Sequence, residues 1–149
     1  MKKQQEFIFL EQQPCFKLYL ASKTVIQAYA PLLKPLGLTY PQYLVMLVLW
    51  ESEPLSVKEL GGRLHLDSGT LSPLLKKLQD KKIVEKVRSK DDERSVLISL
   101  TSAGKKLKEK VYSVQTHIRH QICFNDQRLA EFTGMLDIFT ANLLSHKGR

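Results

Sequence analysis

Apolar residues recur at helical spacing in the first part of the chain. The pattern predicts an α-helix between Cys15 and Tyr29. One of its stripes consists of Phe16, Leu20, Thr24 and Ala28. Pro31 and Pro35 should break this helix, because proline lacks the backbone N–H that a helix interior uses. Gly37 then permits a turn.

Capping residues mark the next helices. One is predicted to start at residues 39–41 and to run to Trp50, with Pro54 beyond its end. Ser56, with Glu59 three positions later, has the capping-box pattern of a short helix. The cluster at residues 67–69 caps a further helix that extends to Leu78. Pro73 lies inside that pattern, so this helix either begins late or bends there.

The hydrophobic period then changes from helical to alternating. Residues 83–88 and 95–100 read as two short strands around a polar turn. Thr101 caps a long helix, and a last helix follows with a seam formed by Leu129, Phe132, Leu136, Phe139 and Leu143. That seam suits burial against a partner helix, and packing within its own chain is the alternative.

Two short capped helices followed by a β-hairpin form the outline of a winged helix-turn-helix, which we place at residues 54–101. The predicted fold class is α+β, mostly α. A length of 149 residues fits a single domain over residues 1–149.

The composition of the chain limits the kinds of partner and the cellular location that are expected. The 23 basic and 15 acidic residues give a net charge of +8, which favours an anionic partner. Two cysteines are too few for a secreted disulfide scaffold. No stretch is apolar enough to indicate a signal peptide or a membrane span, so a cytoplasmic, reducing location is expected.

The second helix of the helix-turn-helix can enter the major groove of double-stranded DNA. Its candidate DNA-contacting residues are Ser68, Thr70, Ser72, Lys76 and Lys77. In the hairpin, Arg88 is a further candidate, Arg94 could reach the minor groove, and Asp92 could orient its guanidinium. Residues 56–95 hold ten basic and seven acidic residues, so position rather than bulk charge carries this interpretation.

Four segments resemble one family: QPCFKLY (13–19), LTYPQYL (38–44), DSGTLSPLLKKL (67–78) and DERSVLISLT (92–101). They are similar to the MarR family and, more narrowly, to its OhrR-type organic-hydroperoxide sensors. The resemblance runs from about Cys15 to Thr101. The last third is similar only as a helical dimerisation region, which implies dimerisation helices at residues 1–36 and 102–149.

The resemblance implies a homodimeric repressor on a palindromic operator, released when organic hydroperoxide oxidises Cys15. It also implies that Tyr29 and Tyr40 of the opposite subunit hydrogen-bond the thiolate, and that Tyr19 lies near the site. Asp92 and Arg94 match the functional pair of the family's wing. One branch of the family has a second cysteine in the late helical region, about where Cys123 falls, which makes Cys123 a candidate resolving thiol in an intersubunit disulfide. Packing as a small hydrophobe is the alternative for Cys123.

The residues themselves support a reactive Cys15. Pro14 fits the first position of a helix, which would place Cys15 in the first turn, where the helix dipole favours a thiolate. If residues 7–10 instead extend the helix upstream, the phenols alone must stabilise the anion. Tyr19 lies one turn from Cys15, whereas Tyr29 is about 21 Å further along the axis than Cys15. An antiparallel copy of the helix would bring Tyr29 to Cys15, which hints at a site shared between two subunits. Phe16 and Leu18 suit organic peroxides better than hydrogen peroxide.

Three other functions compete with this interpretation. His117, His120 and Cys123 cover one helical flank and could bind a metal, but a fourth ligand is not evident, so neither metal nor cofactor is expected. A thiol peroxidase would share Cys15, yet no histidine base lies near it in the sequence, so we do not expect an enzyme. A MarR-type regulator that responds to small aromatic ligands without redox chemistry is the third alternative.

Overall fold

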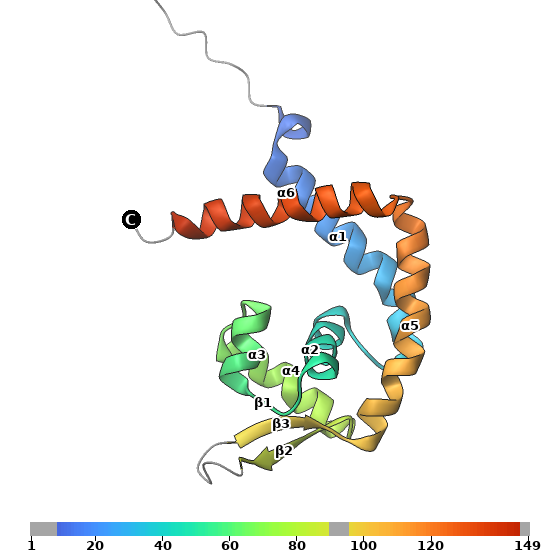
Figure 1. The fold of residues 1–149 in the computed structure, drawn as a ribbon, viewed down its shortest axis with the longest axis vertical. Helices are drawn as coiled ribbons and strands as arrows, with labels where there is room; N and C mark the ends of the chain where they lie inside the picture. Colours follow the sequence, from blue (N-terminus) through green and yellow to red (C-terminus); the bar gives the residue numbers. More distant parts are fainter. Residues whose placement is uncertain (1–8, 90–95, 147–149) are drawn as a thin grey trace, which may run out of the picture. The chain divides into compact units, whose positions relative to one another are not determined.

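The computed structural model describes residues 9–89 and 96–146. Its elements in chain order are η1 (Leu10–Gln12), α1 (Pro14–Leu33), η2 (Lys34–Leu36), α2 (Tyr40–Glu51), β1 (Leu55–Ser56), α3 (Val57–Leu64), α4 (Ser68–Asp80), β2 (Val84–Arg88), β3 (Val96–Leu100), α5 (Ser102–Ile122) and α6 (Asp126–Ser145) (Figure 1). The chain forms two compact units, residues 1–114 and residues 115–149.

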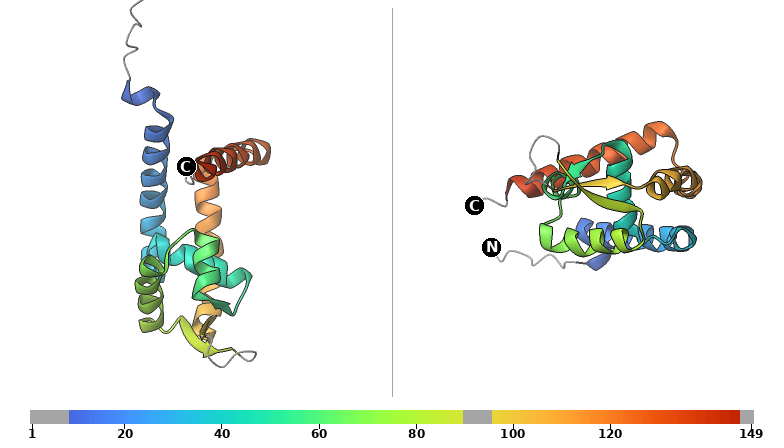
Figure 2. Two further views of the ribbon diagram at one scale, coloured as in Figure 1. Left: turned by 90° about the vertical axis from the view of Figure 1, so that its left-hand side faces the viewer. Right: turned by 90° about the horizontal axis from the view of Figure 1, so that it is seen from below.

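The first unit is a winged helix-turn-helix with mostly helical surroundings, as predicted. Its antiparallel sheet has the strand order β1-β3-β2, and α2, α3 and α4 lie on one side of it (Figure 2). The hairpin pairs Val84 with Leu100 and Arg88 with Val96. The sequence did not predict β1, because two residues are too short to show an alternating pattern. Fully buried side chains from the helices and the sheet form one core, among them Leu33, Met46, Leu49, Leu60, Leu71, Leu78 and Ile98.

The predicted caps are present. Ser56 Oγ accepts a hydrogen bond from Glu59 N at 3.2 Å, and the Glu59 carboxylate accepts one from Ser56 N at 2.8 Å. Asp67 Oδ1 accepts from Thr70 N at 2.8 Å, so α4 begins at Ser68. Thr101 Oγ1 accepts from Gly104 N at 3.1 Å at the start of α5. These side chains satisfy backbone donors that a helix start leaves open, which is why the sequence located them.

One prediction about prolines was wrong, and one of two alternatives for another proline is excluded. The first helix does not break at Pro31 but continues to Leu33. Pro31 lies in the last turn, where it removes only one hydrogen bond from the ladder before the helix ends. Gly37 then adopts a φ of 68°, as the predicted turn requires. The helix around Pro73 does not begin late, because the cap at Asp67 establishes its first turn five residues upstream of that proline.

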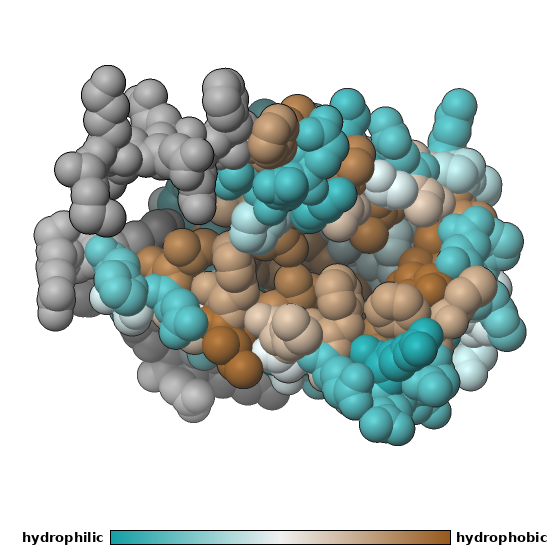
Figure 3. Space-filling view, turned by 90° about the horizontal axis from the view of Figure 1, so that it is seen from above, coloured by the Kyte–Doolittle hydropathy of each residue, from teal (hydrophilic) through white to brown (hydrophobic). Residues whose placement is uncertain are grey.

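The second unit contains the end of α5, a turn and α6. Asn125 Oδ1 caps α6 by accepting from Arg128 N at 2.8 Å, and Arg119 forms an ion pair with Asp126 at 2.6 Å. No residue of α6 is buried, and the seam residues Phe132 and Leu143 are 45% and 57% exposed. The predicted seam is therefore present in sequence but not buried by its own chain. A broad band of hydrophobic residues is visible on the face shown in Figure 3.

Among the described residues, no single helix is long and apolar enough to cross a membrane. The segments 14–36 and 40–51 reach that length and composition only together, and they are bent by 72°.

Candidate functional site

The helix α4 separates its apolar and polar residues cleanly. Leu71, Leu75 and Leu78 are buried on one side of it. The predicted DNA-contacting residues are all exposed, namely Ser68, Thr70, Ser72, Lys76 and Lys77. Burial of the apolar side fixes the rotation of the helix, so the polar residues face solvent together. All five candidates that the sequence selected on this helix are therefore exposed, with Ser68 and Thr70 about 160° apart around the axis in the first turn.

Asp67 organises the start of this surface. Hydrogen bonds from the backbone N–H and the hydroxyl of Thr70 hold the pKa of Asp67 below its ordinary value. Ser72 Oγ donates to the Ser68 carbonyl at 2.7 Å. The hydroxyls of Thr70 and Ser72 are therefore preoriented by the helix, and each oxygen retains capacity to accept a hydrogen bond.

The described part of the hairpin places Arg88 at the exposed end of β2, paired with Val96. Asp92 and Arg94, the predicted functional pair of the wing, lie outside the described residues. Their placement stays a prediction.

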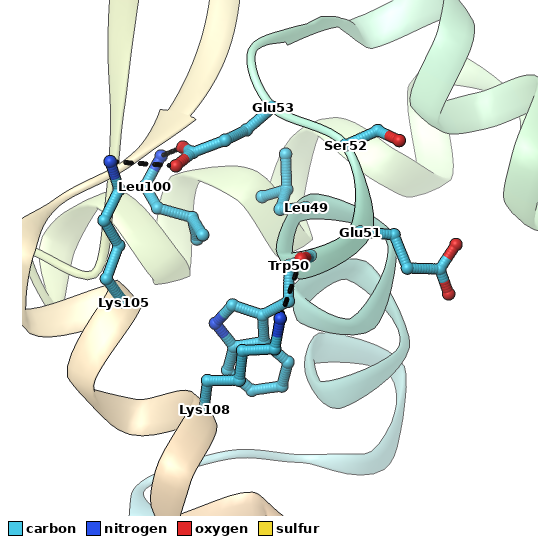
Figure 4. A pocket seen from close by; sticks show the side chains of 8 residues that line it. All are labelled: Leu49, Trp50, Glu51, Ser52, Glu53, Leu100, Lys105 and Lys108. Carbon is cyan, nitrogen blue, oxygen red and sulfur yellow. Dashed lines mark hydrogen bonds and ion pairs between the residues drawn. The ribbon is translucent and has the colours of Figure 1, made fainter.

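The base of the hairpin is fastened to the end of α2 around a cavity of about 310 Å³ (Figure 4). The Glu53 carboxylate accepts hydrogen bonds from Leu100 N and, at 2.9 Å, from Ser99 Oγ, and it pairs with Lys105 Nζ at 3.0 Å. Burial would raise the pKa of Glu53, but the hydrogen bond from Leu100 and the contacts with Lys105 and Ser99 hold it below its ordinary value. Trp50 Nε1 donates to the Gly104 carbonyl at 2.9 Å. No local pattern indicated this anchor, because its members are distant along the chain.

Cys15 is the second residue of α1 and is exposed. Gln13 is extended and separates α1 from the short 3₁₀ turn η1, so the helix does not continue upstream of Pro14. This result confirms the prediction that Cys15 lies in the first helical turn, at the positive end of the dipole. Tyr19, one turn later, is 63% exposed.

Three tyrosines cluster where the end of α1 meets the start of α2. The ring centroid of Tyr29 lies 5.0 Å from that of Tyr40 and 5.4 Å from that of Tyr43. Burial raises the pKa of Tyr29 above its ordinary value, and the proximity of Tyr43 and a hydrogen bond with it raise it further. Burial and Tyr43 likewise raise the pKa of Tyr40. Both phenols therefore keep their protons at neutral pH and can donate hydrogen bonds to an anion.

Tyr43 is 2% exposed and packs against both of the other rings, and it was not among the predicted site residues. A signal was available, because Tyr43 follows Tyr40 by three positions in a predicted helix and shares its side of that helix.

Cys15 and the tyrosine cluster lie at opposite ends of one uninterrupted helix. Cys15 precedes Tyr29 by fourteen residues in α1, a rise of about 21 Å. The structure therefore brings Tyr29 and Tyr40 together, as expected, but within one subunit it does not bring them to Cys15.

Cys123 lies in the turn between α5 and α6, with a φ of 55°, and its thiol donates to the His120 carbonyl at 3.0 Å. It is exposed within the single chain, so its own subunit does not bury it. His117 contacts Gln121 at 3.2 Å instead of a metal-ligating neighbour. Within the described residues, no group of three His, Cys, Asp or Glu side chains is arranged to hold a metal ion.

Comparisons with known proteins agree with this architecture. Residues 27–111 match the family described as transcriptional regulator SarA/Rot. The chain is 52% identical over 105 residues to the organic hydroperoxide resistance transcriptional regulator of Bacillus subtilis, which covers 70% of this chain and 71% of that protein. It is also similar to reduced AbfR bound to DNA, with a TM-score of 0.75 and 33% identity over 91% of this chain and 94% of that one. A disulfide-formed AbfR structure gives a TM-score of 0.66 and 35% identity over 88% and 92% of the two chains.

Proposed function

Since the chain belongs to the MarR-like SarA/Rot family of winged-helix transcriptional regulators, we propose that it is a homodimeric repressor that leaves its operator when an organic hydroperoxide oxidises Cys15. The observation that carries this proposal is the division of the candidate site along α1. Cys15 lies at one end of that helix, and Tyr29, whose ring contacts Tyr40 of α2, lies near the other.

Two copies of the chain would complete the site. An antiparallel α1 from a second subunit would bring its Cys15 beside Tyr29 and Tyr40. The exposed apolar residues of α1 and α6 support such a dimer, because a soluble protein rarely leaves a long apolar stripe in water. These residues include Leu20, Val25, Ile26, Phe132 and Leu143.

DNA binding rests on the exposed polar surface of α4. A dimer would present two such helices to the two half-sites of a palindromic operator. Lys76 and Lys77 would contact phosphates, and Ser68 would contact a base edge or a phosphate. The Thr70 and Ser72 hydroxyls already donate within the chain, so they would accept hydrogen bonds from amino groups at base edges. The AbfR structure named as bound to DNA supports this assignment. For the wing, Arg88, Asp92 and Arg94 are proposed as additional DNA contacts.

The chemistry at Cys15 is a two-electron oxidation. The thiolate attacks one oxygen of the hydroperoxide, the O–O bond breaks, and an alkoxide leaves and takes up a proton to give an alcohol. The sulfur becomes a sulfenic acid. The phenols of Tyr29 and Tyr40 would stabilise the thiolate before attack, and Tyr19 would line the approach. The reaction occurs once per subunit and needs no metal or cofactor.

Cys123 of the partner would then resolve the sulfenic acid. Its thiol would attack the oxidised sulfur, form an intersubunit disulfide and release water. The exposure of both cysteines and the AbfR structure in a disulfide form support this step. A regulator of this kind would work in the cytoplasm, where thiols are kept reduced.

A second candidate function has one observation in its favour. A mostly apolar cavity of about 500 Å³ lies beside Tyr40, lined by residues from the end of α1 and the start of α2. It is large enough for a small aromatic ligand, as a regulator without redox chemistry would require.

One experiment separates the two candidates. A DNA fragment selected by the reduced protein from a random pool is titrated with wild type and Cys15→Ser, before and after treatment with cumene hydroperoxide. We expect wild type to lose affinity and Cys15→Ser to remain bound. Equal release of both proteins would contradict the redox mechanism, and release by an aromatic carboxylate alone would favour the second candidate.

A further inference from the structure

One ammonium group joins the recognition helix α4 to the segment that carries Tyr40. Lys81 follows the last residue of α4, and its Nζ donates to the Gly37 carbonyl and, at 3.1 Å, to Gln42 Oε1. Gly37 and Gln42 stand on either side of residues 38–41. Lys81 therefore spans the turn and the first helical residues that hold the Tyr40 ring.

Gln42 holds this link in one geometry. It is the one buried polar side chain recorded among the described residues, at 1% exposure. Its Oε1 accepts from Thr39 N at 3.1 Å as well as from Lys81. A buried amide oxygen loses stabilisation when a donor departs, so the start of α2 and the end of α4 are held in one relative arrangement.

The link also has a DNA-facing end. The backbone N–H of Lys81 donates to the carbonyl of Lys77 at 3.2 Å, and Lys77 lies on the exposed surface of α4. At the sensor end, Tyr40 contacts Tyr29 and Tyr43, with ring centroids 5.0 and 6.0 Å apart. A short chain of contacts therefore leads from the phenols through Gln42 and Lys81 to the helix that would read DNA.

We propose that Lys81 is a positioning residue that couples the tyrosine cluster to the recognition helix. The inference rests on the proposed function, because it assigns to Lys81 the transmission of a change at the oxidised site. When oxidation displaces Tyr40, the turn at Gly37 and the Gln42 amide move with it, and Lys81 carries that displacement to the end of α4. Such a connection changes the difference in operator affinity between two states, and not merely the affinity of either state.

The test measures the ratio of operator Kd values in the oxidised and reduced states. Four full-length proteins are compared: wild type, Lys81→Met, Lys81→Arg and Lys82→Met. Lys82 is the matched control, because it is an exposed neighbouring lysine whose loss removes the same charge. Mass spectrometry confirms equal oxidation of Cys15 in each sample, and thermal unfolding confirms that each variant is folded.

We expect Lys81→Met to lower the ratio at least about threefold. Lys82→Met should leave the ratio unchanged, and Lys81→Arg, which keeps a cationic donor, should restore most of it. If Lys81 only supports the fold or binds a phosphate, Lys81→Met should change the oxidised and reduced Kd values by the same factor. The ratio would then stay as in wild type, which would overturn the proposal. An equal fall in Lys81→Met and Lys82→Met would also overturn it, because lost charge would then be the cause. If wild type itself shows a ratio of one, the proposed redox function fails, and the coupling role fails with it.

Discussion

The helices α4 and α6 differ in how far their apolar residues are buried within the chain. Leu71 and Leu78 of α4 are fully buried in their own chain, and the polar side of this helix faces solvent. In α6 no residue is buried, although Leu143 and Ile138 are apolar. The difference indicates that α4 is held by intramolecular packing and offers its polar surface to a ligand, whereas α6 needs another apolar surface.

The largest effect is expected when a buried side chain of α4 is truncated. Leu71→Ala should lower the free energy of unfolding by about 3 kcal/mol, because it leaves a cavity beneath the helix. The measurement is urea unfolding followed by circular dichroism. Lys76→Ala on the exposed side of the same helix is the control, because it removes no buried side chain and should change the value little. A loss below about 1 kcal/mol in Leu71→Ala would contradict the packing assigned to α4.

The anchor at Glu53 tests whether the first unit is held by its own polar contacts as well. Glu53→Gln should lower the free energy of unfolding by about 2 kcal/mol at neutral pH, because it weakens a charge-assisted network. The folded pKa of Glu53 lies below its ordinary value of 4.5, so the contribution is complete above that pH and is lost as the pH falls through the folded pKa. Unfolding curves for both proteins should therefore converge below pH 4.5. A gap that stays constant down to pH 2 would show that ionisation of Glu53 is not the cause.

The apolar side of α6 can be tested by a single charge. Leu143→Asp should weaken self-association about tenfold, because a carboxylate would lie in an apolar interface. Analytical ultracentrifugation gives the dissociation constant. Ala141→Asp places the same charge about 160° away around the helix and should have a smaller effect. Equal weakening by the two substitutions would mean that this side of α6 does not form the interface.

The smallest expected effect concerns the polar side of α4. Lys77→Met should weaken operator binding several-fold and reduce the slope of log Kd against log salt by about one, because one phosphate contact is lost. Its unfolding free energy should stay within about 0.5 kcal/mol of wild type, since Lys77 is exposed. An unchanged salt slope would remove Lys77 from the DNA contacts.

Local signals accounted for the elements that the sequence predicted well. The capping residues Ser56, Asp67 and Thr101 marked helix starts because each satisfies backbone donors within three residues. The predicted break at Pro31 was wrong, because a proline near the end of a helix removes few hydrogen bonds and costs little helix stability. The two-residue strand β1 exists only through its pairing with β3, which no local pattern contains.

The features of the candidate site likewise divide into those that local patterns predict and those that depend on packing. Local patterns in the sequence predicted the winged helix-turn-helix, the candidates on α4 and the position of Cys15 in the first turn of α1, because helix starts, hydrophobic periods and turns depend on residues close together in the chain. The packing of helices and strands was needed to bring Tyr29 against Tyr40 and Tyr43, Glu53 against the hairpin and Lys81 to Gln42. These contacts join residues that lie far apart in the chain, and their geometry is fixed by how helices and strands pack rather than by local preference.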